Sequence, residues 1–315
     1  MPDLENTAFT VLPWFKALAD ETRLRLLGVL SRYELNVNEL VLVLKMGQPR
    51  ISRHLKILSA SGLLGCRREG LHVFYSTPSS GKSRVFIDAL HPFLYTDPAM
   101  QPDLDAAAEL IEERARSTRQ FFNAVAEDWD RQARGILGSF DLAATVCGAM
   151  PECGVAADLG CGTGSVLQAM LKKAETVIGV DGSPRMLELA RRRFVGEGGR
   201  VSLRIGDLSH LPLRDGEAAF ASLNMVLHHI SRPAEVLREI RRVLAPAGLL
   251  LLTDFDRHND ERMRNEYGDL RLGFELDTLC SFLVHAGFLV RDTKQAALER
   301  GLVLHCILSE NPAAT

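Results

Sequence analysis

The sequence feature that most constrains the fold is a glycine-rich loop, Asp158-Leu159-Gly160-Cys161-Gly162-Thr163-Gly164. It continues a short apolar stretch, Val155–Leu159, and leads into Val166–Leu171, which has the apolar spacing of a helix. A strand, a glycine loop and a helix in this order form the first unit of a doubly wound α/β fold. Glycine lets the backbone adopt positive φ and approach a ligand closely. We therefore expect a parallel sheet that binds a nucleotide-like ligand at this loop.

Two further acidic residues follow predicted strands. The stretch Thr176–Val180 ends in Asp181, and Val201–Ile205 ends in Gly206-Asp207-Leu208. A carboxylate after the second strand can accept both ribose hydroxyls, a requirement that NAD and S-adenosyl ligands share. An acid after the third strand can accept a hydrogen bond from an adenine amino group. The glycine loop alone is compatible with either a dinucleotide or S-adenosylmethionine as the ligand, and the acidic residues around it discriminate between the two.

With three other motifs, these acids resemble the class I S-adenosylmethionine-dependent methyltransferases of small molecules. The motifs are Asp181-Gly182-Ser183-Pro184-Arg185-Met186-Leu187, Leu227-His228-His229 and Arg242-Val243-Leu244-Ala245-Pro246-Ala247-Gly248. The resemblance spans residues 120–308 and implies a Rossmann-like, seven-stranded, mostly parallel sheet with an antiparallel last strand pair opened by Gly287-Phe288. It implies S-adenosylmethionine as cofactor and S-adenosylhomocysteine as product.

By that resemblance, Asp158 and the loop face the methionine part of the cofactor, Asp181 the ribose and Asp207 the adenine, while Asn224 lies beside the sulfonium. The expected cofactor-binding residues are Asp158, Gly160, Gly162, Gly164, Asp181, Gly182, Met186, Asp207, Leu208 and Asn224.

A catalytic base is needed only if the methyl acceptor starts protonated, because methyl transfer depends largely on proximity and orientation. The candidates follow the fourth and fifth strands, where ligands bind in open parallel sheets; they are His228, His229, Asp254 and His258, with Asp256 and Tyr267 nearby. The charged stretch 254–274 is either an acceptor-recognition lid or a solvated helix. Spacing alone permits a metal at Asp254, Asp256 and His258, but we expect none. Six scattered cysteines without a Cys-x-x-Cys pair indicate neither disulfides nor a zinc cluster.

The N-terminal part has the pattern of a helix-turn-helix. Helical spacing over Thr22–Leu30 and Val37–Leu44 is broken at Gly47, and Pro49 begins another helix through Ser59. In that last helix, Ile51, Leu55 and Leu58 form a buried stripe, so the polar residues face outward, as in a helix that enters the major groove. Two short strands joined at Glu69-Gly70 form a basic hairpin, or wing. The expected DNA-binding residues are Gln48, Arg50, Ser52, Arg53, Lys56, Arg67 and Arg68.

Three segments of this region resemble the winged-helix repressors of the ArsR/SmtB type. They are Ala17-Leu18-Ala19-Asp20-Glu21-Thr22-Arg23-Leu24-Arg25, Ile51-Ser52-Arg53-His54-Leu55-Lys56-Ile57-Leu58 and Gly62-Leu63-Leu64, within residues 14–77. The resemblance implies a homodimer on palindromic double-stranded DNA. Metal-sensing members carry cysteines where this chain has Glu34-Leu35-Asn36-Val37-Asn38-Glu39-Leu40, so that metal site is absent.

The connecting region is predicted to be helical. One helix is expected over Ser79–Leu94, with a proline-punctuated break from His91-Pro92 to Pro102. Apolar residues, Ala108 among them, then recur at spacings of four and three from Leu104 to Trp129, which predicts one long amphipathic helix or two in series. We expect Phe121–Trp129 to cap the cofactor pocket. We predict a winged-helix DNA-binding and dimerisation domain at residues 10–95, a helical linker at 96–120 and a methyltransferase domain at 121–310.

The distribution of charge agrees with the division into a DNA-binding domain and a methyltransferase domain. Residues 1–95 contain 12 Lys and Arg against 8 Asp and Glu, whereas the whole chain has a net charge of −3. No apolar run approaches the length of a bilayer helix and the first residues lack an export pattern, so we expect a cytoplasmic protein without a membrane partner. Two functions fit: a methyltransferase of an unidentified small molecule fused to a DNA-binding regulator, or a non-catalytic regulator that senses S-adenosylmethionine or S-adenosylhomocysteine.

Overall fold

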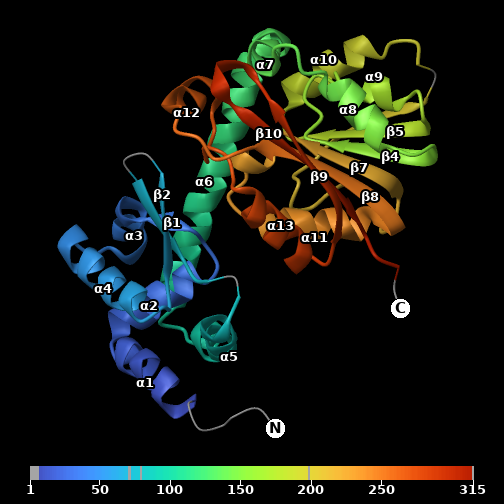
Figure 1. Ribbon diagram of the computed structural model, residues 1–315. Helices are drawn as coiled ribbons and strands as arrows, with labels where there is room; N and C mark the ends of the chain where they lie inside the picture. Colours follow the sequence, from blue (N-terminus) through green and yellow to red (C-terminus); the bar gives the residue numbers. More distant parts are fainter. Residues whose placement is uncertain (1–6, 70–71, 79, 198, 314–315) are drawn as a thin grey trace. The chain divides into compact units, whose positions relative to one another are not determined.

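The computed structural model describes residues 7–69, 72–78, 80–197 and 199–313 (Figure 1). The chain divides into two compact units, residues 1–114 and 115–315. Each unit has its own hydrophobic core. No helix among the described residues is long and apolar enough to cross a membrane.

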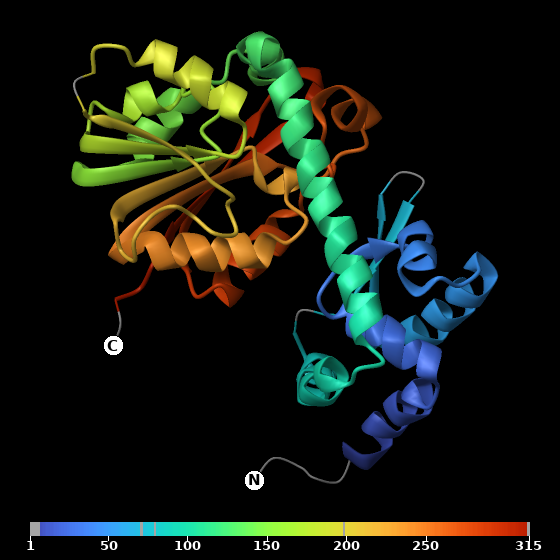
Figure 2. The same ribbon diagram turned by 180° about the vertical axis from the view of Figure 1, so that it is seen from behind.

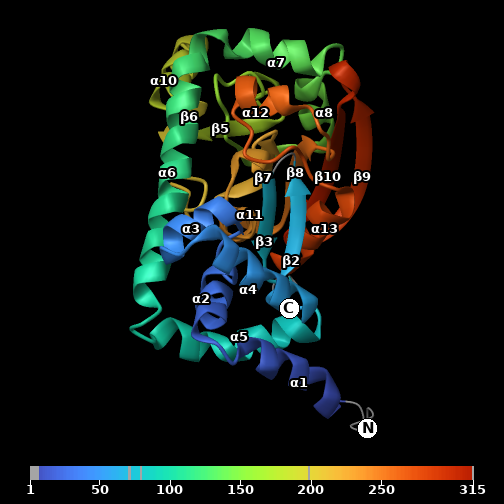
Figure 3. The ribbon, with the colours of Figure 1, turned by 90° about the vertical axis from the view of Figure 1, so that its left-hand side faces the viewer.

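The N-terminal unit is a set of helices with a small antiparallel sheet. Its helices are α1 (Thr7–Leu18), α2 (Glu21–Leu30), α3 (Val37–Leu44), α4 (Gln48–Ala60), α5 (Lys82–Thr96) and the first part of α6 (Gln101–Val125). The sheet has the order β1-β3-β2, from β1 (Leu35–Asn36), β2 (Gly65–Glu69) and β3 (His72–Ser76). Figure 3 shows β2 and β3 side by side. The predicted winged helix-turn-helix is therefore confirmed.

Local capping explains where the helices of this unit begin. The Asp20 side chain accepts a hydrogen bond from the Arg23 backbone N–H and starts α2, while Asn36 and Glu39 form a reciprocal capping box at α3. Gly47 precedes α4 with extended backbone, and Pro49 occupies its first turn. The stripe Ile51, Leu55 and Leu58 is fully buried, as its spacing predicted.

An ion pair fastens α6 to α2 inside this unit. The Arg25 guanidinium donates from Nε to Asp103 Oδ2 at 2.6 Å and from Nη2 to Asp103 Oδ1 at 2.7 Å. Leu104, Ala107 and Ile111 of α6 are buried beyond it, the last two in the core of the unit. Because the Asp103 side chain is only 4% exposed, its charge depends on this partner.

The C-terminal unit is built on a seven-stranded sheet of order β6-β5-β4-β7-β8-β10-β9. Strands β4 (Cys153–Leu159), β5 (Ala174–Asp181), β6 (Val201–Ile205), β7 (Ala218–Asn224) and β8 (Leu244–Phe255) are parallel. Strand β10 (Val303–Glu310) runs antiparallel to β8 and to β9 (Leu289–Ala297). Strands β5 and β6 are added in turn on one side of β4, and β7 and β8 are added in turn on its other side. The strand order therefore reverses at β4. The predicted mostly parallel sheet with an antiparallel last pair is confirmed.

Helices cover both faces of this sheet (Figure 2). On one face lie α8 (Leu142–Ala149), α9 (Leu167–Met170) and α10 (Pro184–Arg193), and on the other lie α11 (Pro233–Val243) and α13 (Leu276–His285). Side chains alternate between the two faces, so Ala156 belongs to the first core and Ala157 to the second. The remaining elements are η2 (Ala126–Asp128), α7 (Trp129–Leu137), η3 (Leu227–His229), α12 (Glu261–Tyr267) and η4 (Glu299–Gly301).

Two details of the predicted connecting region are wrong. The predicted proline-punctuated break begins at Asp97 rather than at His91-Pro92, because α5 continues through Pro92 to Thr96, and α6 begins at Gln101. Buried Ile87 and Leu94 lie on either side of this proline, and their packing offsets the missing backbone hydrogen bond. The second wrong detail is the position of the apolar stripe, because Ala107 rather than Ala108 is buried. The series from Leu104 to Trp129 forms two helices, one of the two predicted arrangements, because α6 ends at Val125 and Trp129 begins α7.

We expect Arg25→Ala to destabilise the N-terminal unit by about 2–3 kcal/mol, because it leaves Asp103 buried and unpaired. Urea unfolding followed by Trp14 fluorescence in a Trp129→Phe background measures this effect in the full chain. The double variant Arg25→Met with Asp103→Leu is the control and is expected to recover most of the loss. A change below about 0.5 kcal/mol for Arg25→Ala would show that the pair is dispensable.

Candidate functional site

The glycine loop after β4 has left-handed backbone at all three predicted glycines. The φ angles are +74° at Gly160, +53° at Gly162 and +79° at Gly164. A Cβ at Gly160 would lie 2.6 Å from Val226 Cγ2, and one at Gly164 would lie 2.8 Å from Phe194 Cε2. Both glycines are therefore required by packing as well as by φ. At Gly162 an added Cβ would lie 3.6 Å from Trp129 Nε1 and 4.0 Å from Met186 Sδ, which are ordinary van der Waals contacts, so φ rather than crowding favours glycine here.

Asp181, at the end of β5, joins the loop to the start of α10. Its Oδ2 accepts the Gly162 backbone N–H at 2.8 Å and its Oδ1 accepts that of Ser183 at 2.8 Å. Burial raises the pKa of Asp181, although these backbone donors act against the rise. The Ser183 hydroxyl accepts from the Met186 backbone N–H and so caps α10. Gly182 leaves space for Arg119, whose Cδ would lie 3.6 Å from an added Cβ.

Asp158, the last polar residue of β4, is buried under the loop. One of its oxygens, Oδ1, accepts from the Ser222 hydroxyl at 2.7 Å and from Asn224 Nδ2 at 3.0 Å. The Asn224 Oδ1 accepts in turn from the Thr253 hydroxyl at 3.1 Å. Burial raises the pKa of Asp158 to about 7, against these two donors. Strands β4, β7 and β8 thus meet in one polar network at their carboxyl ends.

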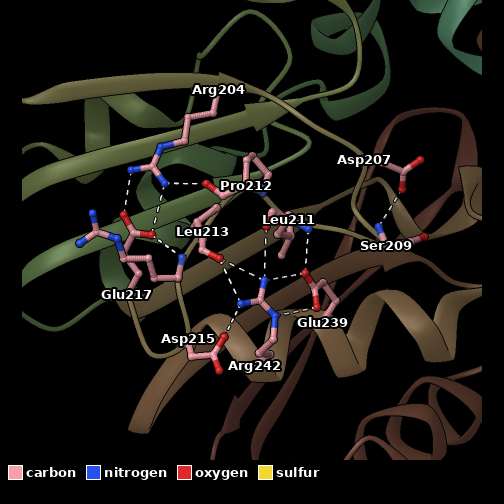
Figure 4. A network of polar contacts seen from close by, with 11 residues as sticks. Arg204, Asp207, Ser209, Leu211, Pro212, Leu213, Asp215, Glu217, Glu239 and Arg242 are labelled. Carbon is pink, nitrogen blue, oxygen red and sulfur yellow. Dashed lines mark hydrogen bonds and ion pairs between the residues drawn. The ribbon is translucent and has the colours of Figure 1, made fainter.

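The segment after β6 carries the predicted adenine contacts. Asp207 is exposed, and its Oδ1 accepts from the Ser209 backbone N–H at 2.7 Å, while Leu208 is buried. Arg242 of α11 holds the following turn, because its guanidinium donates to the carbonyls of Leu211 and Leu213 (Figure 4). Carboxylates of Glu239 and Asp215 surround this guanidinium and raise its pKa. These contacts hold in place the turn that follows Asp207 in the chain.

Aromatic side chains from the end of α6 and the start of α7 lie near the loop. Phe122 packs edge-on against Trp129 with a centroid distance of 5.2 Å, and against His229 at 4.9 Å. Asn123 Oδ1 accepts from the Ser183 hydroxyl at 2.7 Å. These contacts place the segment Phe121–Trp129 beside the glycine loop and α10, where the sequence predicted a cap.

A cluster of histidines and carboxylates is buried after β7 and β8. His228 Nδ1 lies 2.8 Å from Asp254 Oδ1, and the His228 backbone N–H donates to Asp254 Oδ2 at 3.2 Å. On its other side, His228 Nε2 lies 3.5 Å from Asp269 Oδ1. Burial opposes the charge of His228, but the two carboxylates raise its pKa to about 10. Burial and the neighbouring His228 lower the pKa of His229 to about 4.

The other predicted catalytic candidates have separate partners. Asp256 accepts from His305 Nε2 at 3.0 Å, and His258 Nδ1 accepts from the Asp260 backbone N–H at 3.2 Å. Burial lowers the pKa of His258. Among the described residues, Asp254, Asp256 and His258 do not converge on one point as metal ligands would. Tyr267 is buried in a core cluster with its neighbours on α12.

The expectation that the charged stretch 254–274 lies outside the core is wrong in part. Asp269, within this stretch, is 2% exposed, and Met263, Tyr267 and Leu272 are buried. His305, on β10, carried no sequence signal, because a lone histidine in an apolar strand is typical of a core position. It reaches Asp256 only because β10 pairs with β8, with His305 opposite Asp254.

The predicted DNA-binding residues of α4 are exposed. Gln48, Ser52, Arg53 and Lys56 face solvent, and Arg50 is exposed but donates from Nη2 to the Thr22 hydroxyl at 3.0 Å. In the wing, Arg68 is exposed, whereas Arg67 is part of an ion-pair network. Its guanidinium pairs with Glu34 at 3.2 Å and with Glu69, and lies over the Phe74 ring. The geometry gives Arg67 a structural role in the hairpin.

We expect Asp158→Asn to reduce the loss of stability between pH 5 and pH 8. The pKa of Asp158 is higher in the folded chain than in the unfolded chain, so folding binds a proton between pH 3.8 and about 7 and stability falls as pH rises. The effect is on the order of 3 kcal/mol. Asparagine keeps the acceptor Oδ1 for Ser222 and Asn224. Thermal unfolding of both proteins at the two pH values measures the difference, and equal pH dependence would contradict it.

Comparison with known proteins identifies both units. The model of the arsR family of bacterial regulatory proteins matches residues 20–64, and the model of a methyltransferase domain matches residues 157–252. The transcriptional activator HlyU of Vibrio cholerae is 36% identical over 91 residues, which cover 29% of this chain and 83% of HlyU. The HlyU match is thus longer than the segment that the family model matches.

The other relatives match part of the chain. A 37.1 kDa protein of transposon TN4556 in Streptomyces fradiae is 34% identical over 157 residues, covering 49% of this chain and 44% of that protein. The demethylmenaquinone methyltransferase of Lactobacillus johnsonii is 36% identical over 98 residues, covering 30% of this chain and 40% of that enzyme. The chain thus spans less than half the length of these two relatives.

Among solved structures, the complex between the Haloferax volcanii Trm112 methyltransferase activator and a methyltransferase matches with a TM-score of 0.51 and 20% identity. It covers 61% of this chain and 97% of that chain, and it supports the fold. The methyltransferase match confirms the cofactor predicted from the sequence. The chain belongs to the arsR family of bacterial regulatory proteins and carries an S-adenosylmethionine-dependent methyltransferase domain.

Proposed function

We propose that this chain methylates a small molecule with S-adenosylmethionine and also regulates transcription as a homodimer on a palindromic operator. The observation that carries the enzymatic part is the convergence of Asp158, Asp181 and the positive-φ glycine loop at the strand order reversal beside β4. Ligands of doubly wound sheets bind at such a point.

The residues present fit the cofactor. Asp181 uses one lone pair on each oxygen for backbone donors, so further lone pairs remain for ribose hydroxyls. Asp207 is exposed; its Oδ1 accepts one backbone N–H, and its Oδ2 lies 3.8 Å from Arg119 Nη1, so an adenine amino group would compete with this arginine for Oδ2. The buried Asp158 and the amide of Asn224 line the side toward β7 and β8. When bound, the cofactor supplies an electrophilic methyl group on a sulfonium.

The protein's part in the reaction is then mainly orientation. His228 is cationic near neutral pH in the arrangement described, so it donates rather than accepts a proton. With a pKa of about 4, His229 is neutral but weakly basic. Neither histidine alone would therefore be an effective general base for a methyl acceptor that must lose a proton before it reacts. We infer that the acceptor is nucleophilic when it binds, or that it is activated by another group at this site.

A second function, ligand sensing, is favoured by the continuity of α6. This single helix carries Asp103, which pairs with Arg25 in the N-terminal unit, and Asn123, which contacts Ser183 at the start of α10. A cofactor that rearranges the Asp181–Ser183 segment would act on the end of a helix that begins in the DNA-binding unit. Regulation then requires that the ligand bind one state of the chain more tightly than the other.

We expect Asp181→Asn to weaken S-adenosylhomocysteine binding by about 10-fold or more, because hydrogen bonds to a charged group contribute about 1.5–3 kcal/mol. Asparagine can still accept the Ser183 N–H, so the loop is disturbed less than by alanine. Isothermal titration calorimetry measures the affinity, and thermal unfolding checks the fold. Asp292→Ala, an exposed acid on β9, is the matched control. Equal affinities of Asp181→Asn and the control would refute the proposed pocket.

We expect Arg53→Ala with Lys56→Ala to weaken DNA binding. The slope of log K against log salt is expected to become shallower by about 1 for each phosphate that the variant no longer neutralises. Fluorescence anisotropy with DNA from upstream of the chain's own gene, over a range of KCl concentrations, measures both quantities. Lys172→Ala, an exposed lysine of the C-terminal unit, is the matched control. An unchanged salt slope would show that α4 does not contact DNA.

The same titration with and without saturating S-adenosylhomocysteine tests the sensing function. Sensing predicts a change in DNA affinity that Asp181→Asn abolishes. Equal affinities in the presence and absence of the ligand exclude it and leave the enzymatic function standing.

A further inference from the structure

Three buried side chains of the C-terminal unit bring one donor atom each to a common point. They are His228, His229 and Asp269, and their donor atoms all lie within 4.8 Å of one another. Asp269 Oδ1 is 3.5 Å from His228 Nε2 and 3.9 Å from His229 Nε2. The side chains are 2%, 5% and 1% exposed, respectively. Two imidazoles and one carboxylate are a typical donor set for zinc.

The tautomers of both histidines suit this role. His229 Nδ1 lies 3.1 Å from the Gly268 carbonyl oxygen, which can only accept, so this nitrogen carries the hydrogen and Nε2 presents a lone pair. His228 Nδ1 faces Asp254 Oδ1 at 2.8 Å in the same manner. A carboxylate or carbonyl behind each ligand histidine is the usual arrangement at metal centres, because it orients the ring and makes the other nitrogen a better donor.

Asp269 provides an independent observation that points to a missing cation. Both of its oxygens are buried, and neither has a hydrogen-bond partner among the described residues. The separations of 3.5 and 3.9 Å from the two histidines exceed those of good hydrogen bonds. A buried carboxylate without donors is costly, whereas a metal ion would satisfy it.

The spacing of the donors also agrees with a tetrahedral ion. Zinc bonds of about 2.0–2.1 Å at tetrahedral angles separate neighbouring ligand atoms by about 3.3 Å. The two separations from Asp269, 3.5 and 3.9 Å, need only a small contraction to reach this value, and the two histidine donor atoms lie within 4.8 Å of each other. Octahedral magnesium prefers oxygen ligands and several waters, which this buried pair of imidazoles does not offer.

We propose that His228, His229 and Asp269 bind a zinc ion. The competing arrangement is a protonated His228 placed between Asp254 and Asp269, which balances charge but leaves both Asp269 oxygens without a donor at good hydrogen-bond distance. The metal replaces that proton. Three protein ligands leave a fourth position for a water or for a small-molecule donor atom, as in catalytic rather than closed structural zinc sites. The proposal does not depend on methyl transfer.

The test uses the full chain, freed of any affinity tag and stripped of metal with a chelator. Calorimetric titration with ZnCl₂ and metal analysis after dialysis are expected to give one zinc per chain, and zinc is expected to raise the midpoint of thermal unfolding. Cobalt(II) in place of zinc is expected to give the intense visible absorption of a tetrahedral nitrogen–oxygen site. Cobalt bands of thiolate coordination would place the metal on cysteines and overturn the proposal.

Variants separate the ligand set from adventitious binding. Asp269→Asn, which keeps the shape of the side chain, and His229→Ala are each expected to weaken zinc binding by more than about 100-fold, whereas Asp254→Asn, behind His228, is expected to weaken it by about 10–100-fold. His285→Ala, an exposed histidine of α13, is the matched control and is expected to bind as the parent does.

Circular dichroism of the metal-free variants establishes that they fold. If the parent chain binds no zinc at micromolar concentrations, or if Asp269→Asn binds it as tightly as His285→Ala, the site does not exist.

Discussion

Carboxylates placed where parallel strands end are the constraint on which the C-terminal unit depends. Asp158, Asp181 and Asp254 are buried or nearly so at or near the carboxyl ends of β4, β5 and β8, and burial raises the pKa of Asp158 and Asp181. Each must find donors or a counterion within the fold. The segments after these strands supply many of these donors, so the residues that bond the carboxylates also form the ligand site.

The three carboxylates are satisfied by three different means. Asp158 receives a hydroxyl and an amide from β7, Asp181 receives backbone N–H groups of two loops, and Asp254 receives the ring and backbone of His228. Neutral donors leave the pKa of Asp158 raised to about 7, whereas Asp254 and Asp269 raise the pKa of His228 to about 10. Asp158 is therefore easily protonated, whereas the carboxylates near the end of β8 favour a positive charge, either a proton on His228 or the proposed metal ion.

Site residues whose position follows from the neighbouring sequence were predicted, whereas those whose position depends on packing against distant segments were missed. Asp158, Asp181 and Asp207 were predictable because an acid directly after an apolar strand must lie at the sheet edge. Asp269 was not, because it lies in a charged run that is typical of exposed helices, and its burial depends on η3 and β8, which are distant in sequence. Likewise, Pro92 predicted a break in α5, and only core packing of residues on either side explains its absence.

The aromatic side chains of Trp129 and Phe122 lie between the cofactor loop and the histidine cluster and contact both. Trp129 approaches Gly162, Phe122 packs edge-on between Trp129 and His229, and the His228 and His229 rings lie 4.1 Å apart. A ligand that moves Trp129 must therefore repack Phe122, and Phe122 fixes the ring of His229. Since Asn123, the next residue, holds Ser183, the same short segment touches both sides of the pocket. A continuous row of packed rings thus connects the cofactor loop to the side chains around Asp269.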